Sequence, residues 1–204
     1  MSRTDAAVVP NPYAAPASSV QGPSATDTPA FFVVSPTKLV VLYVATLGLY
    51  PVFWFYMHWA RIRAASGTRL WPVPRAVFAV VFVHALARRI DGALRGAGVA
   101  RRWWPMSLAS AFVALELLNY GSAIAWPWLV FHLPNGWLWL EWLSLLVMPL
   151  SCACLVRLQI AANAACGDPR AQANRHFTVF NLAWIVLGVV AIGWVLYGIA
   201  TGIV

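Results

Sequence analysis

The chain has 204 residues, of which 61% are hydrophobic and only 10% are charged, whereas ordinary soluble domains have about 25% charged residues. Its formal net charge is +8, but the arginines flank apolar runs instead of covering one polar face. This placement argues against a nucleic-acid-binding protein. It predicts basic residues retained beside anionic lipid headgroups on the cytoplasmic side of a membrane.

Residues 1–34 are predicted to form a disordered tail. Their prolines are scattered among Ala, Ser and Thr, and no apolar period is present that could offset the entropy lost on ordering. Arg3 is followed by Asp5, and no apolar stretch precedes a cleavage site, so this segment is not expected to be a signal peptide.

The first membrane-spanning helix is expected over about Thr37–Met57. It ends in an aromatic cluster followed by Arg61 and Arg63, which is the order in which a helix leaves a bilayer on its cytoplasmic side. Pro51, three residues after Gly48, predicts a kink in this helix.

An amphipathic helix that lies in the plane of the membrane, or re-enters it, is predicted over about 75–95. Its apolar run, Ala76–Ala87, has only twelve residues, which favours such a helix over a spanning one, although a spanning helix remains the alternative. The i+3 and i+4 spacings give a polar face of His84, Arg88, Asp91 and Arg95 and an apolar face of Phe78, Phe82, Leu86 and Ile90. The candidate contacts to anionic lipid headgroups are Arg88, Arg89, Arg95, Arg101 and Arg102.

Three further spans are expected over about Trp103–Trp126, Trp137–Val156 and Phe177–Ile203. The first two should form an antiparallel hairpin, because 127–136 contains the turn signal Pro134-Asn135-Gly136 and no basic residue. If 75–95 lies in the interface, 58–102 and 157–176 are cytoplasmic with 9 + 3 = 12 basic residues, against two outside. If 75–95 spans, the count is 10 inside and 4 outside, and the N-terminus changes side.

The fold class predicted is therefore an all-α integral membrane protein with four transmembrane helices and one amphipathic in-plane or re-entrant helix. Within it, Glu116 is the sharpest candidate for an intramembrane polar site, because an ionised carboxylate at mid-bilayer depth costs several kcal/mol unless it is paired or hydrated. Asn119 and Tyr120 follow on the same helix face. Such a triplet can bind a cation or relay a proton, or it can be a protonated carboxyl that packs helices together. Of the first span, Tyr43, Thr46 or Tyr50 can reach that depth.

Catalytic and cofactor-binding patterns are missing from the sequence. The histidines are dispersed, so no metal site is expected, and there is no phosphate-binding loop, dinucleotide-binding glycine pattern or nucleophile elbow. We therefore expect no cofactor and no enzymatic activity.

Two motif regions resemble one family. The first contains Ser35-Pro36-Thr37-Lys38-Leu39, Thr46-Leu47-Gly48-Leu49-Tyr50, Trp54-Phe55-Tyr56 and Trp59. The second contains Asp168-Pro169, Asn174, Phe177, Asn181 and Gly188. Both are similar to small bacterial polytopic membrane proteins of unknown function, over roughly a third of the chain. The resemblance implies a location in the bacterial inner membrane and carries no activity with it.

The function expected from the sequence is that of a non-enzymatic envelope protein, a scaffold or accessory subunit that acts through membrane lipids, a protein partner or a second copy of the chain. The alternative is a small transporter or channel that uses Glu116. A second polar residue packed against Glu116 beside a water-wide cavity favours transport, whereas dry and tight packing favours the scaffold.

Overall fold

The computed structural model describes residues 30–132 and 138–201. In these ranges the chain forms α-helices and one short 3₁₀ helix (η1) and no strand, which confirms the predicted all-α class. The helices are α1 Pro36–Ala45, α2 Tyr50–Ser66, α3 Pro72–Val77, α4 Ala79–Gly96, α5 Pro105–His132, α6 Leu138–Ala165, η1 Gln172–Asn174 and α7 Val179–Thr201.

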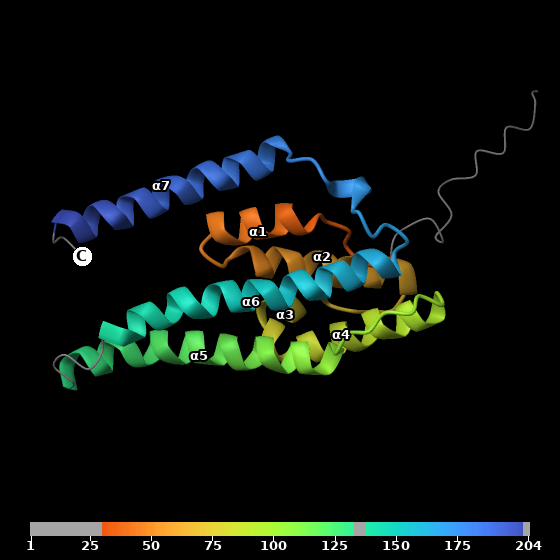
Figure 1. Ribbon diagram of the computed structural model, residues 1–204, viewed down its shortest axis with the longest axis horizontal. Coiled ribbons are helices and arrows are strands. Elements are labelled where there is room, and N and C mark those ends of the chain that lie inside the picture. Colours follow the sequence, from red (N-terminus) through yellow and green to blue (C-terminus); the bar gives the residue numbers. More distant parts are fainter. Residues whose placement is uncertain (1–29, 133–137, 202–204) are drawn as a thin grey trace, which may run out of the picture.

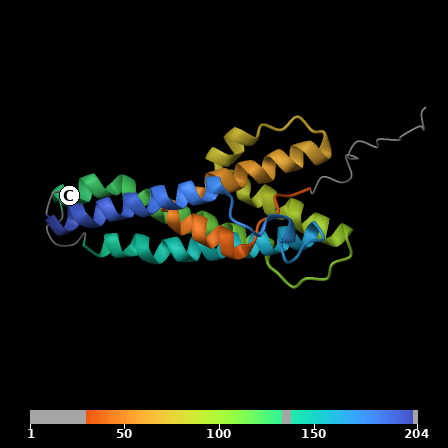
Figure 2. The same cartoon turned by 90° about the horizontal axis from the view of Figure 1, so that it is seen from above.

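The molecule is elongated, with α5 and α6 running antiparallel along its length (Figure 1). The α1–α2 pair covers one side of α6, α7 packs against α1, and α4 lies beside α5 and α6 (Figures 1 and 2). Toward one end α2, α4 and α6 finish and α5 begins, whereas α7 begins nearer the middle of the long axis (Figures 1 and 2). We call the end where α2, α4 and α6 finish the basic end, because the described arginines lie toward it, except that Arg75 is on α3 farther from the end, with its guanidinium 4.6 Å from the centre of the Trp59 ring. The opposite, apolar end, which α5, α6 and α7 form, has no arginine among the described residues.

The single helix expected over Thr37–Met57 is instead two helices, α1 and α2, which form a tight hairpin. The chain reverses at Thr46–Leu49, where Leu47 and Gly48 have φ values of 50° and 83°. Glycine adopts such a left-handed conformation at little cost. Pro51 does not kink a continuous helix but lies in the first turn of α2, where its missing N–H does no harm.

The predicted tail ends too late, because Phe31–Ser35 is an ordered, extended and buried segment. It is held by an amide cluster, which we define as Gln159, Asn163 and Asn174. Gln159 Nε2 donates to the carbonyl of Phe32 (2.9 Å), Asn163 Nδ2 to that of Val34 (2.9 Å) and Asn174 Nδ2 to that of Val33 (3.0 Å). These bonds satisfy backbone groups that no helix or strand pairs. Residues 1–29 lie outside the described part of the chain.

The same cluster anchors α2. Gln159 Oε1 accepts from Trp54 Nε1 at 2.5 Å and lies 3.2 Å from His58 Nε2, while Gln159 Nε2 also reaches Asn163 Oδ1 at 2.6 Å. Both Trp54 and His58 are fully buried. This packing explains why α6 continues to Ala165, nine residues past the predicted end of its span at Val156.

The segment expected as one amphipathic helix over 75–95 is α3 and α4, with a break at Phe78. Leu86 and Ile90 of its predicted apolar face are fully buried, together with Val83, Ala87 and Leu94, and Phe82 is half-buried. Phe78 is exposed because it lies at the turn between the two helices. On the polar face, Arg88 and Arg95 are exposed.

Helix α7 begins with reciprocal capping: Thr178 Oγ1 and N donate to Asn181 Oδ1 (3.0 and 3.1 Å), and Asn181 N donates back to Thr178 Oγ1. Gly188 then lets the α7 backbone touch α1, because a Cβ at this position would overlap the carbonyl of Ala45. Small residues permit such close crossings between helices.

Helices α5, α6 and α7 overlap the three later spans expected from the sequence. By length and composition, one described stretch, Leu146–Ala165 of α6, can cross a membrane, which is weak evidence for membrane association. Pro36–Ala45 and Val179–Trp194 are shorter apolar helices. The predicted turn Pro134-Asn135-Gly136 and the end of the last span, 202–203, lie outside the described residues.

Candidate functional site

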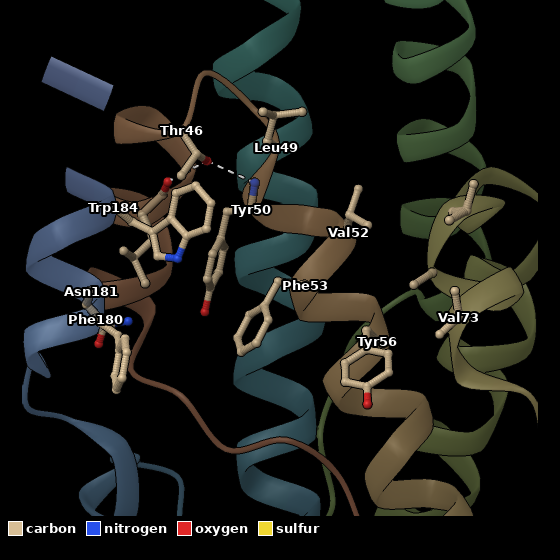
Figure 3. A pocket seen from close by; sticks show the side chains of 13 residues that line it. Thr46, Leu49, Tyr50, Val52, Phe53, Tyr56, Val73, Phe180, Asn181 and Trp184 are labelled. Atoms are coloured by element: carbon tan, nitrogen blue, oxygen red, sulfur yellow. Dashed lines mark hydrogen bonds between the residues drawn. The ribbon is translucent and has the colours of Figure 1, made fainter. Parts of the chain in front are cut away.

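The tip of the α1–α2 hairpin has a closed backbone. The N–H groups of Thr46, Leu47, Gly48 and Leu49 donate to carbonyls of the preceding residues, and that of Val52 donates to the carbonyl of Leu49. Tyr50 N donates to the Thr46 hydroxyl at 2.9 Å (Figure 3), and Pro51 has no N–H. Every N–H from 46 to 52 is therefore bonded without water.

The side chains at this tip are apolar although they face outward. Leu47 is 54% exposed and Leu49 is 71% exposed. A turn in water normally carries polar residues. A closed backbone with exposed leucines is the combination that a hydrocarbon surrounding requires.

Glu116 lies in the polar cluster of α1, α5 and α6 that also contains Tyr43 and Ser151. The Ser151 hydroxyl is within reach of both the Glu116 carboxyl and the Tyr43 hydroxyl. Glu116 and Ser151 are buried, and Ser151 Oγ has no partner with strict hydrogen-bond geometry among the described residues. Tyr43 was one of three first-span residues expected to reach this depth.

The other two residues of the predicted triplet are more exposed than Glu116. Tyr120 is 55% exposed and lies close enough to Glu116 for the two to interact electrostatically, while Asn119 is half-buried. In the described residues no side-chain hydrogen bond joins Asn119 or Tyr120 to Glu116. The partners of the carboxyl come from α1 and α6, which sequence spacing on α5 alone cannot identify.

The predicted headgroup contacts are all exposed at the basic end: Arg88, Arg89, Arg95, Arg101 and Arg102. Arg95 forms an ion pair with Asp91, which also accepts from Trp103 Nε1 at 3.1 Å. The Arg89 guanidinium lies 5.9 Å from the centre of the Trp59 ring. The other polar residue of this face, His84, is turned toward α5, with its Nε2 atom 3.0 Å from Ser110 Oγ.

Lys38 joins this basic end, contrary to the expected orientation in which it lies across the membrane from 157–176. Its Nζ donates to Asn174 Oδ1 (2.7 Å) and to the carbonyl of His176 (2.8 Å). Residues in direct contact cannot lie on opposite faces of a bilayer. The hairpin is the physical reason, because it returns the chain to the end from which it entered.

A largely apolar groove of about 600 Å³ runs along α2 between α7 and α3. Figure 3 shows Trp184, Phe180 and Asn181 of α7 on one side of Tyr50 and Phe53, with Val73 of α3 on the other. Tyr56 lies farther along α2, and Ala76 and Val77 complete the α3 wall. Glu116 does not line this groove. Sequence reasoning missed it because its α3 and α7 walls come from segments more than 100 residues apart.

No protein-family model, curated protein or solved structure matches the chain. Among the described residues there is also no group of three His, Cys, Asp or Glu side chains placed to hold a metal ion. The described residues offer apolar contact along the groove, positive charge at the basic end and the buried carboxyl of Glu116.

Proposed function

We propose that this chain is a multi-pass protein of the bacterial inner membrane that acts without catalysis, as a scaffold or accessory subunit, through contacts with lipids and with a partner protein. In this proposal α5, α6 and α7 cross the bilayer, and α1–α2 enters from the cytoplasmic side and returns. It thus has three crossings, with the first predicted span replaced by a re-entrant hairpin.

Dimensions support this placement. Helices α5 and α6 have 28 residues each, about 42 Å at 1.5 Å per residue, and a bilayer with its headgroup regions is about 40–45 Å thick. Ser151 is the fourteenth residue of α6, so the contact between Ser151 and Tyr43 sets the hairpin close to the bilayer midplane. Helix α1, with ten residues, is about 15 Å long, half of the roughly 30 Å hydrocarbon core.

The single observation that carries the proposal is the hairpin tip, with its bonded N–H groups and exposed leucines. Such a turn is stable at the midplane and would expose apolar surface in water. The charges agree with it. With Lys38 beside His176, the described basic residues from 38 to 175 number 13, and all belong to one side, as cytoplasmic retention of Lys and Arg predicts.

Cysteine labelling tests the hairpin. With Cys152, Cys154 and Cys166 changed to Ala, the variants Thr37→Cys and Thr68→Cys should both react with a membrane-impermeant maleimide only in inside-out vesicles, because both lie at the basic end. Leu47→Cys should react in neither vesicle orientation until detergent is added. Labelling of Thr37→Cys and Thr68→Cys from opposite sides would restore a crossing first helix and overturn the proposal.

The second candidate function is a small transporter or channel. The observation that favours it is the polar cluster of Glu116, Tyr43 and Ser151 at mid-depth. Its burial and its absence from the lining of the groove support the scaffold instead, because a translocation path needs a hydrated cavity beside the carboxyl. Uptake assays with Glu116 variants, described in the Discussion, separate the two.

A further inference from the structure

We propose that the groove between α2, α3 and α7 binds one acyl chain of an anionic phospholipid of the inner leaflet, with its headgroup at the basic end. This inference rests on the proposed membrane placement and assigns a ligand class to one site. It separates a specific lipid site from the general lipid-facing surface of the helices.

The shape of the groove fits a chain that lies along α2. The groove has a floor and two walls, and a volume of about 600 Å³ falls within the roughly 300–1,000 Å³ of small-ligand pockets. Its lining is dominated by aliphatic and aromatic side chains, and its few polar groups are the hydroxyls of Thr46, Tyr50 and Tyr56 and the amide of Asn181 (Figure 3). Flexible hydrocarbon is complementary to such a surface.

The length of the groove also matches. Leu49 lines its deep end near the hairpin tip, and Val52 and Tyr56 continue along one stripe of α2. Arg63 follows Tyr56 by seven residues, two helical turns, and therefore extends the same stripe. From Leu49 to Arg63 the rise is about 21 Å, and one leaflet with its headgroups is about 20–22 Å thick.

Positive charge marks the shallow end at Arg63, which is exposed on α2. A second positive charge lies beside the α7 wall, where Lys38 Nζ is 6.0 Å from the centre of the Phe177 ring. Lys38 is only 3% exposed and its ammonium donates to Asn174 and His176, so the cation that is free to meet a headgroup is Arg63. The described residues that line the groove include no carboxylate. An apolar slot that leads toward an exposed arginine is complementary to an acyl chain with an anionic headgroup.

The test uses the full-length protein in mild detergent and phosphatidylglycerol with a photoreactive diazirine in one acyl chain. After irradiation, peptide mass spectrometry should find the label mainly on α2 and α7 residues of the groove. Unlabelled phosphatidylglycerol should compete better than phosphatidylcholine. Label spread evenly over the outer faces of α5, α6 and α7 would show only annular lipid and overturn the proposal.

Matched variants sharpen the result. Val73→Trp fills the groove from its rim, because Val73 is 59% exposed, whereas Val81→Trp places the same ring on α4 outside the groove at 69% exposure. Val73→Trp should lower labelling several-fold and Val81→Trp should not. Equal labelling of both variants would overturn the proposal.

Headgroup recognition is tested with Arg63→Gln, for which Arg101→Gln is the exposed control. Arg63→Gln should reduce the preference for phosphatidylglycerol over phosphatidylcholine about five-fold, since one basic residue near an anionic surface has an effect of that size. An unchanged preference would remove the anionic headgroup from the assignment. If the lipid label enters the groove only after deletion of residues 1–29, the occupant of the groove in the full-length protein is that segment and not a lipid, and the proposal is wrong.

The membrane placement and the lipid site are tested by different experiments, so either can be wrong without the other. If the cysteine labelling supports the hairpin but no variant changes lipid labelling, the groove site is wrong and the re-entrant topology stands. If Thr37→Cys and Thr68→Cys react from opposite sides, the placement itself is wrong, whatever lipid the detergent-solubilised protein binds.

Discussion

The two halves of α6 are stabilised in different ways. At the basic end its side chains include Gln159 and Asn163, which are fully buried and bond to Trp54, His58 and the extended Phe31–Ser35 segment. At the apolar end α5, which packs against α6, and α7, which packs against α1, present exposed aliphatic and aromatic side chains, such as Ile124 and Trp194. One half of α6 thus lies in a hydrogen-bonded protein core, and the other half lies where the surrounding exposed surface is apolar.

This difference shows that the two ends of the molecule depend on different interactions. Buried amides need fixed partners, because an unpaired polar group in a low-dielectric interior is costly. The hydrogen bonds of the buried amides therefore fix the packing of the basic end, and all of their partners belong to this chain. Among the described residues the apolar end lacks such partners, and in the proposed placement lipid or another protein covers it. The hairpin tip and the groove lie where these two regimes meet.

The largest effect is expected at the amide cluster. Gln159→Leu should destabilise the protein by about 3 kcal/mol or more, because it leaves Trp54 Nε1 and the Phe32 carbonyl buried without their partner. Thermal unfolding in mild detergent measures this. Gln172→Leu, the same change at an exposed position, is the control and should have little effect. Similar losses for both would mean that the cluster does not hold the basic end together.

The next effect concerns the crossing of α7 and α1. Gly188→Ala should destabilise the protein by about 1–3 kcal/mol, because its methyl group overlaps the Ala45 carbonyl and forces the helices apart. Gly193→Ala is the matched control on the same helix, where an added Cβ meets nothing within 4 Å. It should be neutral or slightly stabilising, since Ala favours the helix. If the two variants unfold alike, α7 does not pack on α1 as closely as described.

A third prediction asks whether the carboxyl of Glu116, which lies between the basic and the apolar ends, has a structural or a functional role. Glu116→Gln keeps shape and hydrogen bonding and should change stability little, whereas Glu116→Leu should cost about 1–2 kcal/mol by leaving neighbouring polar groups unpaired. The loss should be less than additive with Ser151→Ala, because the two side chains share one cluster.

Glu116→Gln also tests the transporter alternative. In proteoliposomes, a proton- or cation-dependent flux that disappears in this variant, while its folding is normal, would set the scaffold aside in favour of transport. Unchanged behaviour of the Gln variant in such assays supports the structural role of the carboxyl.

Sequence patterns predicted helices where α5, α6 and α7 lie, because the periodicity and length of an apolar run are local properties of the sequence. Of these, one described stretch, Leu146–Ala165, is long and apolar enough to cross a membrane. Sequence patterns also placed Tyr43 among the possible neighbours of Glu116. They did not predict the reversal at Thr46–Leu49, since a continuous apolar run reads as one helix and its Gly and Pro read as a kink. The Phe31–Ser35 segment was missed for another reason. Its order comes from amides such as Gln159, 127 residues away from Phe32, and not from any local period.

The smallest effect is expected in the exposed loop before α7, where Asp168 Oδ2 accepts from Ala173 N and Oδ1 from Gln172 N, both at 2.9 Å. These two bonds hold the pKa of Asp168 below its ordinary 3.8, and the bond from Ala173 N has the larger effect. A depressed folded-state pKa stabilises the fold above the unfolded value, and this contribution is lost as pH falls through the folded value.

The stability difference between the wild-type protein and Asp168→Asn should therefore be small at neutral pH, because Asp168 is exposed, and should shrink below pH 3.8. Chemical denaturation of both proteins in the same detergent over a range of pH measures it. Taking the difference cancels the titration of the other carboxyls, provided that they do not couple to Asp168. A difference that stays constant down to the lowest pH would mean that the ionised carboxylate does not order the loop that positions Asn174.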